Sequence, residues 1–165
     1  MATYTIAQAQ PEDYGTIAEI YNQAIQQGNA SMEETEKTAE SIAGWVAGFH
    51  NRERLYVLRD AEGIQGWGIL KRYSDREGYR FAAETAVYLW QNQARKGYGS
   101  ALKKHLIVEA RSLEYHHLVA KIFAINTGSI QYNLKLGYTI VGTQKEVGWK
   151  DGQWMDIVIM QLILS

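Results

Sequence analysis

The segment between residues 87 and 106 constrains the fold of this chain more than any other part. A short apolar run, Val87-Tyr88-Leu89, predicts a buried strand, and an amphipathic pattern over residues 101–106 predicts a helix. Between them lies a short basic loop with two glycines, Gly97 and Gly99. Glycine lets a backbone turn tightly and approach a ligand closely, and the start of a helix presents unpaired N–H groups. This arrangement predicts an anion site suited to a phosphate or pyrophosphate group.

Two common phosphate-binding motifs are absent from this segment. A P-loop requires the pattern G-x-x-x-x-G-K-[ST], and the chain contains no such string. The dinucleotide fingerprint G-x-G-x-x-G would place its third glycine where Leu102 stands. Taken alone, the loop therefore leaves two interpretations open, a phosphate site or a flexible turn that merely opens a helix.

Composition limits the classes of protein to which the chain can belong. Hydrophobic residues make up 46% of its 165 residues, which fits one folded domain over residues 1–165. The net charge of −1 gives no bulk attraction to nucleic acid or to an anionic membrane, and no apolar run is long enough to span a bilayer. The chain has no cysteine, which excludes disulfides and a catalytic thiol, and its four histidines lack metal-binding spacing. We expect a cytoplasmic protein without a metal site.

Hydrophobic periodicity predicts a mixed α/β sheet. Strands are expected at residues 3–7, 55–58, 64–73, 80–89, 118–124, 138–146 and 153–164. Helices are expected from a cap at Asp13 to a break at Gly28, and then at residues 38–49, 99–113 and 129–136, where Gly137 ends the last one. Because strands and helices follow each other in this order, helices should lie on both faces of the sheet.

Further motifs surround the glycine loop in a recognisable order. The string NTGSI at residues 126–130 precedes a helix that ends in LGY at 136–138, and GWKDGQWMD follows at 148–156. Near the start lie IYNQAI at 20–25 and ASME at 30–33. Together with an acidic residue ahead of the Val-Tyr-Leu strand, this pattern resembles the GNAT N-acetyltransferase superfamily, and within it the phosphinothricin acetyltransferase-like branch. The resemblance spans nearly the whole chain.

The resemblance implies a GNAT (acyl-CoA N-acyltransferase) fold, in which a mixed central sheet splays near its middle strands to admit the cofactor. Acetyl-CoA would be the cosubstrate, with its pyrophosphate on the glycine loop and its pantetheine arm bound like an extra strand. The implied cofactor-binding residues are Val87, Tyr88, Leu89, Arg95, Lys96, Gly97, Tyr98, Gly99, Ser100, Asn126, Ser129 and Asn133. The acetyl group would pass directly to a primary amine in a ternary complex, because a chain without cysteine cannot form a thioester acyl-enzyme.

Glu84 is the candidate catalytic residue. It lies in the apolar run AAETAV at residues 82–87, where a carboxylate must be paired, face a cleft or hold its proton unusually tightly. Acetyl transfer requires a neutral amine, so a general base at this point, acting directly or through water, fits the reaction. Glu84 also matches the position of the branch's proposed base. The alternative is a strand carboxylate that faces solvent or pairs with a neighbouring arginine.

Two positions depart from the family pattern. Ala94 stands where the loop motif [RQ]-x-x-G-x-[GA] begins, so the grip on phosphate would depend on backbone groups, with Gln93 or Arg95 as substitutes. Many members place a proton-donating tyrosine three residues before the leucine of the Leu-Gly pair, and Asn133 stands there in this chain. Tyr132 is one residue early, which on a helix is a rotation of about 100°. The sequence therefore leaves the acid that protonates the CoA thiolate unassigned, and water is an alternative.

The acceptor side is the least defined part of the sequence. Arg80 resembles the arginine of the branch's substrate-side Tyr-Arg pair, and with Tyr73 it predicts a clamp for an α-carboxylate, although a solvated hairpin is the alternative. We expect the acceptor to be a small amino acid or an analogue of the phosphinothricin or methionine sulfoximine kind. A second hypothesis is a peptide N-terminus, a lysine or a polyamine, for which Glu33 and the carboxylates beside it would be ligands. A third is an acyl-CoA-binding sensor without turnover.

The branch also implies a homodimer. Trp149, Trp154 and Met155 lie in a segment that the family uses near its subunit contact, and a symmetric pair is the commonest closed oligomer. The alternative is that the tryptophans fill the core, which is the interpretation we favour for at least one of them.

Overall fold

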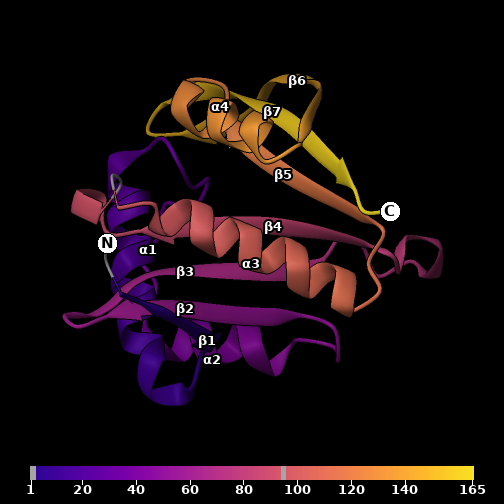
Figure 1. Cartoon of the computed structure of the whole chain (residues 1–165). Helices are drawn as coiled ribbons and strands as arrows, with labels where there is room; N and C mark the ends of the chain where they lie inside the picture. The colour runs from indigo at the N-terminus through magenta and orange to yellow at the C-terminus, as the bar shows by residue number, and fades with distance from the viewer. Residues whose placement is uncertain (1–2, 94–95) are drawn as a thin grey trace.

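The strands of the chain form one seven-stranded sheet in the computed structural model, which describes residues 3–93 and 96–165 (Figure 1). The strands are β1 (Thr5–Gln8), β2 (Arg54–Asp60), β3 (Gly63–Arg72), β4 (Ala82–Leu89), β5 (His117–Phe123), β6 (Thr139–Lys150) and β7 (Gln153–Ile163). The helices are α1 (Tyr14–Gln27), α2 (Ala39–Ala47), α3 (Tyr98–Ser112) and α4 (Thr127–Lys135), with short 3₁₀ turns at Pro11–Asp13, Glu77–Tyr79 and Gln91–Gln93. The predicted mixed α/β sheet is confirmed.

The order of the strands is β1-β2-β3-β4-β5-β7-β6, and β4 and β5 are the one parallel pair among them. That pair is short, because Ala82–Glu84 lies beside His117–Val119 and the pairing stops there. Figure 1 shows the two strands meeting at one end and separating toward the other. Residues 85–89 of β4 therefore have a hydrogen-bonded neighbour in β3 but none in β5. The expected splay of the middle strands is present.

Helices lie on both faces of the sheet, as the alternation of elements predicted. α1 and α2 pack on one face over β2, β3 and β4, and α3 packs on the other face, with α4 beside it (Figure 1). Over residues 3–93 and 96–165, no helix combines the length and the apolar character needed to cross a membrane.

Caps define where the two N-terminal helices begin and end. Gly28 ends α1 with a φ of 76°, in the left-handed region that glycine adopts without a steric penalty. Thr38 caps α2 by accepting a hydrogen bond from the Ser41 N–H at 3.3 Å. Asp13 holds the N-cap position of α1, as predicted, but its side chain makes no capping hydrogen bond to that helix. Its buried carboxylate instead accepts the Gln10 N–H at 2.9 Å and pairs with Arg59 at 3.0 Å, which satisfies the charge away from α1.

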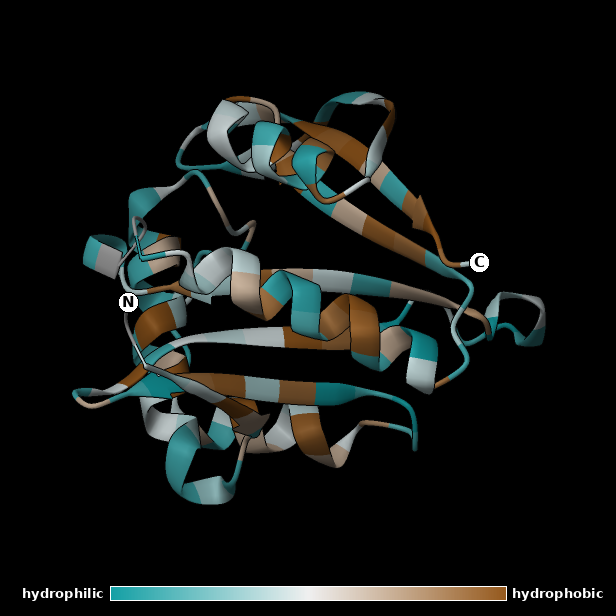
Figure 2. Ribbon diagram, in the orientation of Figure 1, coloured by the Kyte–Doolittle hydropathy of each residue, from teal (hydrophilic) through white to brown (hydrophobic). Residues whose placement is uncertain are grey.

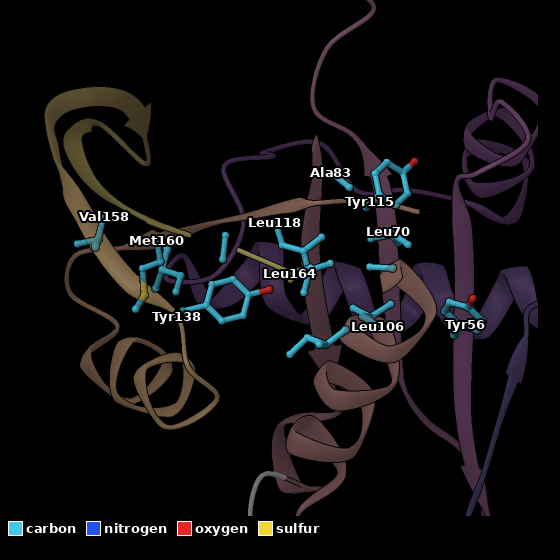
Figure 3. Packing of buried hydrophobic residues seen from close by; sticks show 14 residues of the cluster. Tyr56, Leu70, Ala83, Leu106, Tyr115, Leu118, Tyr138, Val158, Met160 and Leu164 are labelled. Atoms are coloured by element: carbon cyan, nitrogen blue, oxygen red, sulfur yellow. The ribbon is translucent and has the colours of Figure 1, made fainter. Parts of the chain in front are cut away.

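Two apolar cores fill the space between the sheet and its helices. Figure 2 shows hydrophobic stretches along β5 and β7 and alternating polar and apolar segments along α3. The core beneath α3 and α4 runs across the sheet as one layer, which Figure 3 shows from Val158 and Met160 of β7 to Tyr56 of β2. The core beneath α1 and α2 is built from Tyr14, Ile17, Ala18, Ile20, Tyr21, Ile25, Ile42, Leu55, Val57, Trp67 and Ile69.

The last hairpin differs from its prediction. β6 extends to Lys150 rather than to residue 146, because the chain turns only at Asp151-Gly152, where both residues have positive φ. The expectation that Trp149 or Trp154 lies in the core is wrong. The two side chains are 52% and 59% exposed, and their rings meet edge to face at 4.7 Å.

The core beneath α3 should depend strongly on Leu106, which is fully buried in it. We expect Leu106→Ala to lower the free energy of unfolding by about 2–5 kcal/mol, because it removes apolar contacts and leaves a cavity. Val108→Ala on the same helix is the control, since Val108 is exposed, and should change it by about 0.5 kcal/mol or less. Urea denaturation measures both values, and equal effects would contradict this packing.

Candidate active site

β4 presents alternate side chains to the two faces of the sheet. Glu84, Ala86 and Tyr88 lie on the face covered by α1 and α2, where they line a large cleft. Val87 and Leu89 point to the other face and pack against residues of α3. This alternation is the ordinary two-residue period of a strand. Because β4 is unpaired on one side beyond Glu84, the cleft can meet a second cavity at its edge.

The cleft on the α1 and α2 side has a volume of about 1080 Å³. The half-buried Glu84 carboxylate lines it, and the Lys121 Nζ lies 3.7 Å from Glu84 Oε2. An aromatic cluster also lines the cleft and is formed by Tyr21, Trp45, Trp67 and Tyr88. The centroids of neighbouring rings in this cluster lie 4.8–5.9 Å apart. Glu84 is therefore both cleft-facing and paired. An apolar, aromatic cavity with a few converging charges is typical of a small-molecule site.

The loop between α1 and α2 forms one wall of this cleft and is fastened to the β6–β7 hairpin. The Ser31 hydroxyl hydrogen-bonds the Tyr21 hydroxyl at 2.7 Å, and the buried Lys150 Nζ donates to the Ser31 carbonyl. Burial lowers the pKa of Lys150, an effect that Asp151 opposes. The predicted acceptor residue Glu33 lines the cleft and forms an ion pair with Lys37 at 2.8 Å.

The second cavity is a narrow slot of about 100 Å³ between the diverging strands β4 and β5. It is lined by Asn29, Ala30, Thr85, Ala86, Val87, Tyr88, Lys103, Ala120, Lys121, Ile122, Phe123, Asn126, Ser129, Tyr132 and Asn133. Several residues line both cavities, namely Ala30, Thr85, Ala86, Tyr88, Lys121 and Phe123. The slot and the cleft therefore adjoin at the splay, so a molecule in one would reach a molecule in the other.

The glycine loop lies at the start of α3. Gly97 has a φ of 78°, and the first turn has no side-chain cap, so its N–H groups are left for a ligand. Lys96 and Gly97 are exposed and Ser100 is half-buried. Tyr98 differs from these, because its side chain is fully buried and its hydroxyl donates to Asp60 Oδ2 at 2.7 Å. Only the backbone groups of Tyr98 are therefore available for the predicted contact with the cofactor. Arg95 and Ala94 lie outside the described residues.

The start of α4 supplies polar groups to the slot. Asn126 caps the helix, because its Oδ1 accepts the Ser129 N–H at 3.2 Å. Asn133 is 2% exposed, and its Nδ2 donates to the Ser129 carbonyl at 2.8 Å. Its buried Oδ1 has no hydrogen-bond partner in the part of the chain that the structure describes. A buried amide oxygen without a partner is unfavourable, so one in the wall of a slot fits a ligand that brings an N–H group, as pantetheine does.

Tyr132 is engaged elsewhere. Its hydroxyl donates to the carbonyl of Gly99 and so joins α4 to the glycine loop. Burial raises the pKa of Tyr132 above its ordinary value.

Lys103 is a slot residue that the sequence analysis missed. It lies on α3 and is 3% exposed, and its Nζ sits 4.9 Å from the centre of the Tyr138 ring. Burial lowers its pKa to about 7, although the negative charge of Glu84 acts in the opposite direction. A signal was available, because Lys103 precedes Ile107 by four residues and Ala110 by seven and so falls on the apolar face of its helix.

The predicted acceptor residues Tyr73 and Arg80 do not line the cleft that holds Glu84. Tyr73 lines a separate hollow of about 530 Å³, where its ring meets that of Tyr79 at 5.4 Å. The Arg80 guanidinium lies 4.6 Å from the Phe81 ring centre and donates to the Glu77 carbonyl at 2.9 Å. Their role in acceptor binding stays a prediction. The cationic side chains that do line the cleft are Lys37, Lys71, Arg72 and Lys121.

Known proteins share this sequence and fold. Residues 6–159 match the family described as the acetyltransferase (GNAT) domain. The L-methionine sulfoximine/L-methionine sulfone acetyltransferase of Pseudomonas aeruginosa is 34% identical over 166 residues, which cover 98% of this chain and 95% of that protein. The L-amino acid N-acyltransferase MnaT of Escherichia coli is 30% identical over 162 residues, which cover 95% and 92%.

A solved structure agrees with these relatives. The GNAT superfamily phosphinothricin acetyltransferase from Sinorhizobium meliloti, in complex with AcCoA, superposes with a TM-score of 0.92 at 29% identity, and the match covers 99% of this chain and 89% of that one. The matched residues include those that line both cavities and the diverging strands β4 and β5. The chain therefore belongs to the GNAT acetyltransferase family.

Proposed function

We propose that this protein moves the acetyl group of acetyl-CoA to the primary amine of a small amino acid or an amino-acid analogue of the methionine sulfoximine or phosphinothricin kind. The observation that carries the proposal is the meeting of two cavities at the splay of β4 and β5, with Glu84 in the wider one. The names of the relatives support the class of acceptor, since they act on methionine sulfoximine, methionine sulfone and L-amino acids. We take residues 1–165 as one domain.

The narrow slot suits the donor. Residues 85–89 of β4 have no strand partner on the slot side, so backbone groups of Val87 and Leu89 are available to the pantetheine arm in the manner of an added strand. Asn133 Oδ1 would accept one of its amide N–H groups. The glycine loop and the positive end of α3 would hold the pyrophosphate. In the proposed reaction acetyl-CoA is the cosubstrate and no metal ion takes part.

The wide cleft suits the acceptor. An incoming ammonium group would compete with Lys121 for the Glu84 carboxylate and give up a proton to it. The neutral amine would then attack the acetyl carbonyl of the donor, which reaches it from the adjoining slot. The C–N bond forms as the C–S bond breaks. The α-carboxylate of the acceptor would meet Lys71, which lies opposite Glu84 in the register of β3 and β4.

We also propose a homodimer that acts in the cytoplasm. β6 is an edge strand of the sheet, and the β6–β7 hairpin carries exposed apolar side chains at Ile140, Val141, Val147, Trp149, Trp154 and Ile163. Apolar surface of this kind supports a contact with a second copy of the chain. The cytoplasm fits a donor that is a charged, water-soluble thioester.

The role of Glu84 can be tested with Glu84→Gln, which keeps the size of the side chain but removes the base. We expect acetyl-CoA binding to persist and kcat to fall by about 10²-fold near neutral pH in an assay of free CoA release. The deficit should shrink at high pH, where amines lose their proton unaided.

Glu40→Gln is the matched control, because Glu40 is exposed on α2 and does not line the cleft. A panel of amino acids, sulfoximines, phosphinates, peptides and polyamines identifies the acceptor. If Glu84→Gln retains the wild-type kcat across the pH range, Glu84 is not the base, and if no amine releases CoA, the proposed function is wrong.

The phosphate site can be tested with a pair of glycines in the same backbone conformation. Gly97 and Gly152 have φ values of 78° and 77°, and no atom of the described residues lies within 4 Å of a Cβ added to either. Alanine at each position should therefore carry the same strain of about 1 kcal/mol. We expect Gly97→Ala alone to raise the dissociation constant of acetyl-CoA, by about tenfold, because its Cβ occupies space beside the loop. Calorimetric titration that gives the two variants equal affinity would refute the placement of the pyrophosphate.

The dimer can be tested by light scattering at micromolar concentration. One chain has a mass of 18.7 kDa, and we expect the wild type to show twice that mass. Replacing Trp149 and Trp154 with glutamate should return it to the mass of one chain, because like charges would meet in the contact. A wild type with the mass of a single chain would exclude the dimer at that concentration.

A further inference from the structure

The cofactor slot contains a buried cation that its fold does not require. Lys103 is 3% exposed on the apolar face of α3, between Leu102 and the turn that carries Leu106. In residues 3–93 and 96–165, no carboxylate lies within 4.0 Å of its Nζ and no hydrogen bond to it is found. The face of the Tyr138 ring, with its centre 4.9 Å from the Nζ, stabilises the charge in part. An unpaired ammonium in such a place is destabilising, which points to a role in the chemistry of the slot.

The reaction needs a group of this kind on the donor side. Acetyl transfer releases CoA as a thiolate, and a negative charge that forms in a narrow, poorly hydrated slot must be neutralised or protonated. Glu84 does not line the slot, and in the proposed reaction it has its own task with the amine.

The other polar side chains of the slot are occupied or unsuitable. The Tyr132 hydroxyl donates to the Gly99 carbonyl, and the Tyr88 hydroxyl points to the Ala30 carbonyl at 3.4 Å. Burial raises the pKa of both phenols above their ordinary value. Asn133 has no acidic proton, and the side chain of Lys121, which lies 3.7 Å from Glu84, is 49% exposed. Lys103 is the one buried cation that lines the described part of the slot.

We propose that Lys103 is a catalytic residue that holds a positive charge beside the CoA sulfur and protonates the thiolate as it leaves. This inference rests on the proposed function. When the amine attacks, its nitrogen becomes positively charged and the carbonyl oxygen negative. Collapse of that intermediate restores the carbonyl and breaks the C–S bond. Before the attack, Glu84 passes to solvent the proton that it took from the substrate ammonium. It then takes a second proton from the new amide nitrogen, and the Lys103 ammonium gives a proton to sulfur. Glu84 passes the second proton to solvent and Lys103 regains one from solvent, so the substrate ammonium and acetyl-CoA give the amide, the free thiol of CoA and one proton.

The surroundings of Lys103 allow this exchange near neutrality. Burial lowers its pKa to about 7, and Glu84 on β4 opposes that effect. The other titratable groups around the slot are Tyr88 of β4, Lys121 of β5, Tyr132 of α4 and the buried Tyr138 ahead of β6, whose pKa burial raises to about 12. Lys103 binds its proton less tightly in the folded chain than in the unfolded one. It therefore destabilises the fold fully below about pH 7, and this effect fades as pH rises toward its unfolded pKa of about 10.4.

The experiment titrates the thiol of CoA while it is bound. Ultraviolet absorbance of the thiolate is followed against pH for CoA on the wild type, on Lys103→Met and on Lys104→Met, the control, whose exposed lysine is the next residue on the same helix. A cation beside the sulfur should lower the pKa of the bound thiol by about 1–3 units. We expect that lowering in the wild type and in Lys104→Met, and its loss in Lys103→Met. Methionine is an apolar residue of similar length, so Lys103→Met should melt at or above the temperature of the wild type below pH 7.

Kinetics gives the second measurement. Lys103→Met should lower kcat by about 10²-fold with little change in the KM for acetyl-CoA. The wild-type kcat should decline above about pH 7 as Lys103 loses its proton, and this decline should be missing in the variant. Lys103→Arg keeps the charge and should keep the low thiol pKa, which separates charge from packing.

The outcomes distinguish the two proposals. If CoA binds and acetyl transfer proceeds, but the bound thiol has the same pKa in the wild type and in Lys103→Met, the role of Lys103 is wrong and the proposed function stands. If calorimetry finds no binding of CoA or acetyl-CoA to the wild type, both are wrong.

Discussion

The pairing of β4 with β5 stops after three residue pairs, and the functional features of this molecule depend on the point where it stops. A parallel strand pair of ordinary length would occupy the backbone groups of residues 85–89 and leave no space between the strands. The early end of the pairing opens the slot, exposes the edge of β4 and lets the slot meet the wider cleft. The period of two along β4 then places Glu84 on the face with the cleft and Val87 on the face covered by α3.

Charged groups in apolar surroundings mark the places where the chain gives up stability for function. The side chain of Glu84 is half-buried, Lys103 and Lys150 are buried, and burial lowers the pKa of both lysines. Lys150 recovers part of that loss through its hydrogen bond to the Ser31 carbonyl, so its role is to hold a loop in place. Lys103 makes no such bond to the residues that the structure describes, and it faces a cavity. This difference in hydrogen-bond partners distinguishes Lys150, which has a structural role, from Lys103, for which we propose a catalytic one.

Local patterns predicted the elements of the fold well, because each strand and helix carries its own period and its own end signals. The splay was not visible in those patterns and came from the family resemblance, since it depends on which strands meet and for how long. Glu84 and the glycine loop carried local signals. The cleft-facing cations Lys71 and Lys121 did not, because their shared cavity exists only once β3, β4 and β5 are side by side. Arg80 showed the reverse, since a plausible local motif lies outside that cavity.

The fastening of the α1–α2 loop by the last hairpin also bears on the order in which the two cavities form. The bond from Lys150 to the Ser31 carbonyl joins residues 119 positions apart, whereas α3 and β4, on one side of the slot, are neighbours in the chain. Contacts between distant residues carry a larger loop-closure entropy and tend to form late. A chain emerging from the ribosome would thus have β4 and α3 in place while the wall of the acceptor cleft is still loose. Competence to recognise an amine would therefore require the β6–β7 hairpin to be in place.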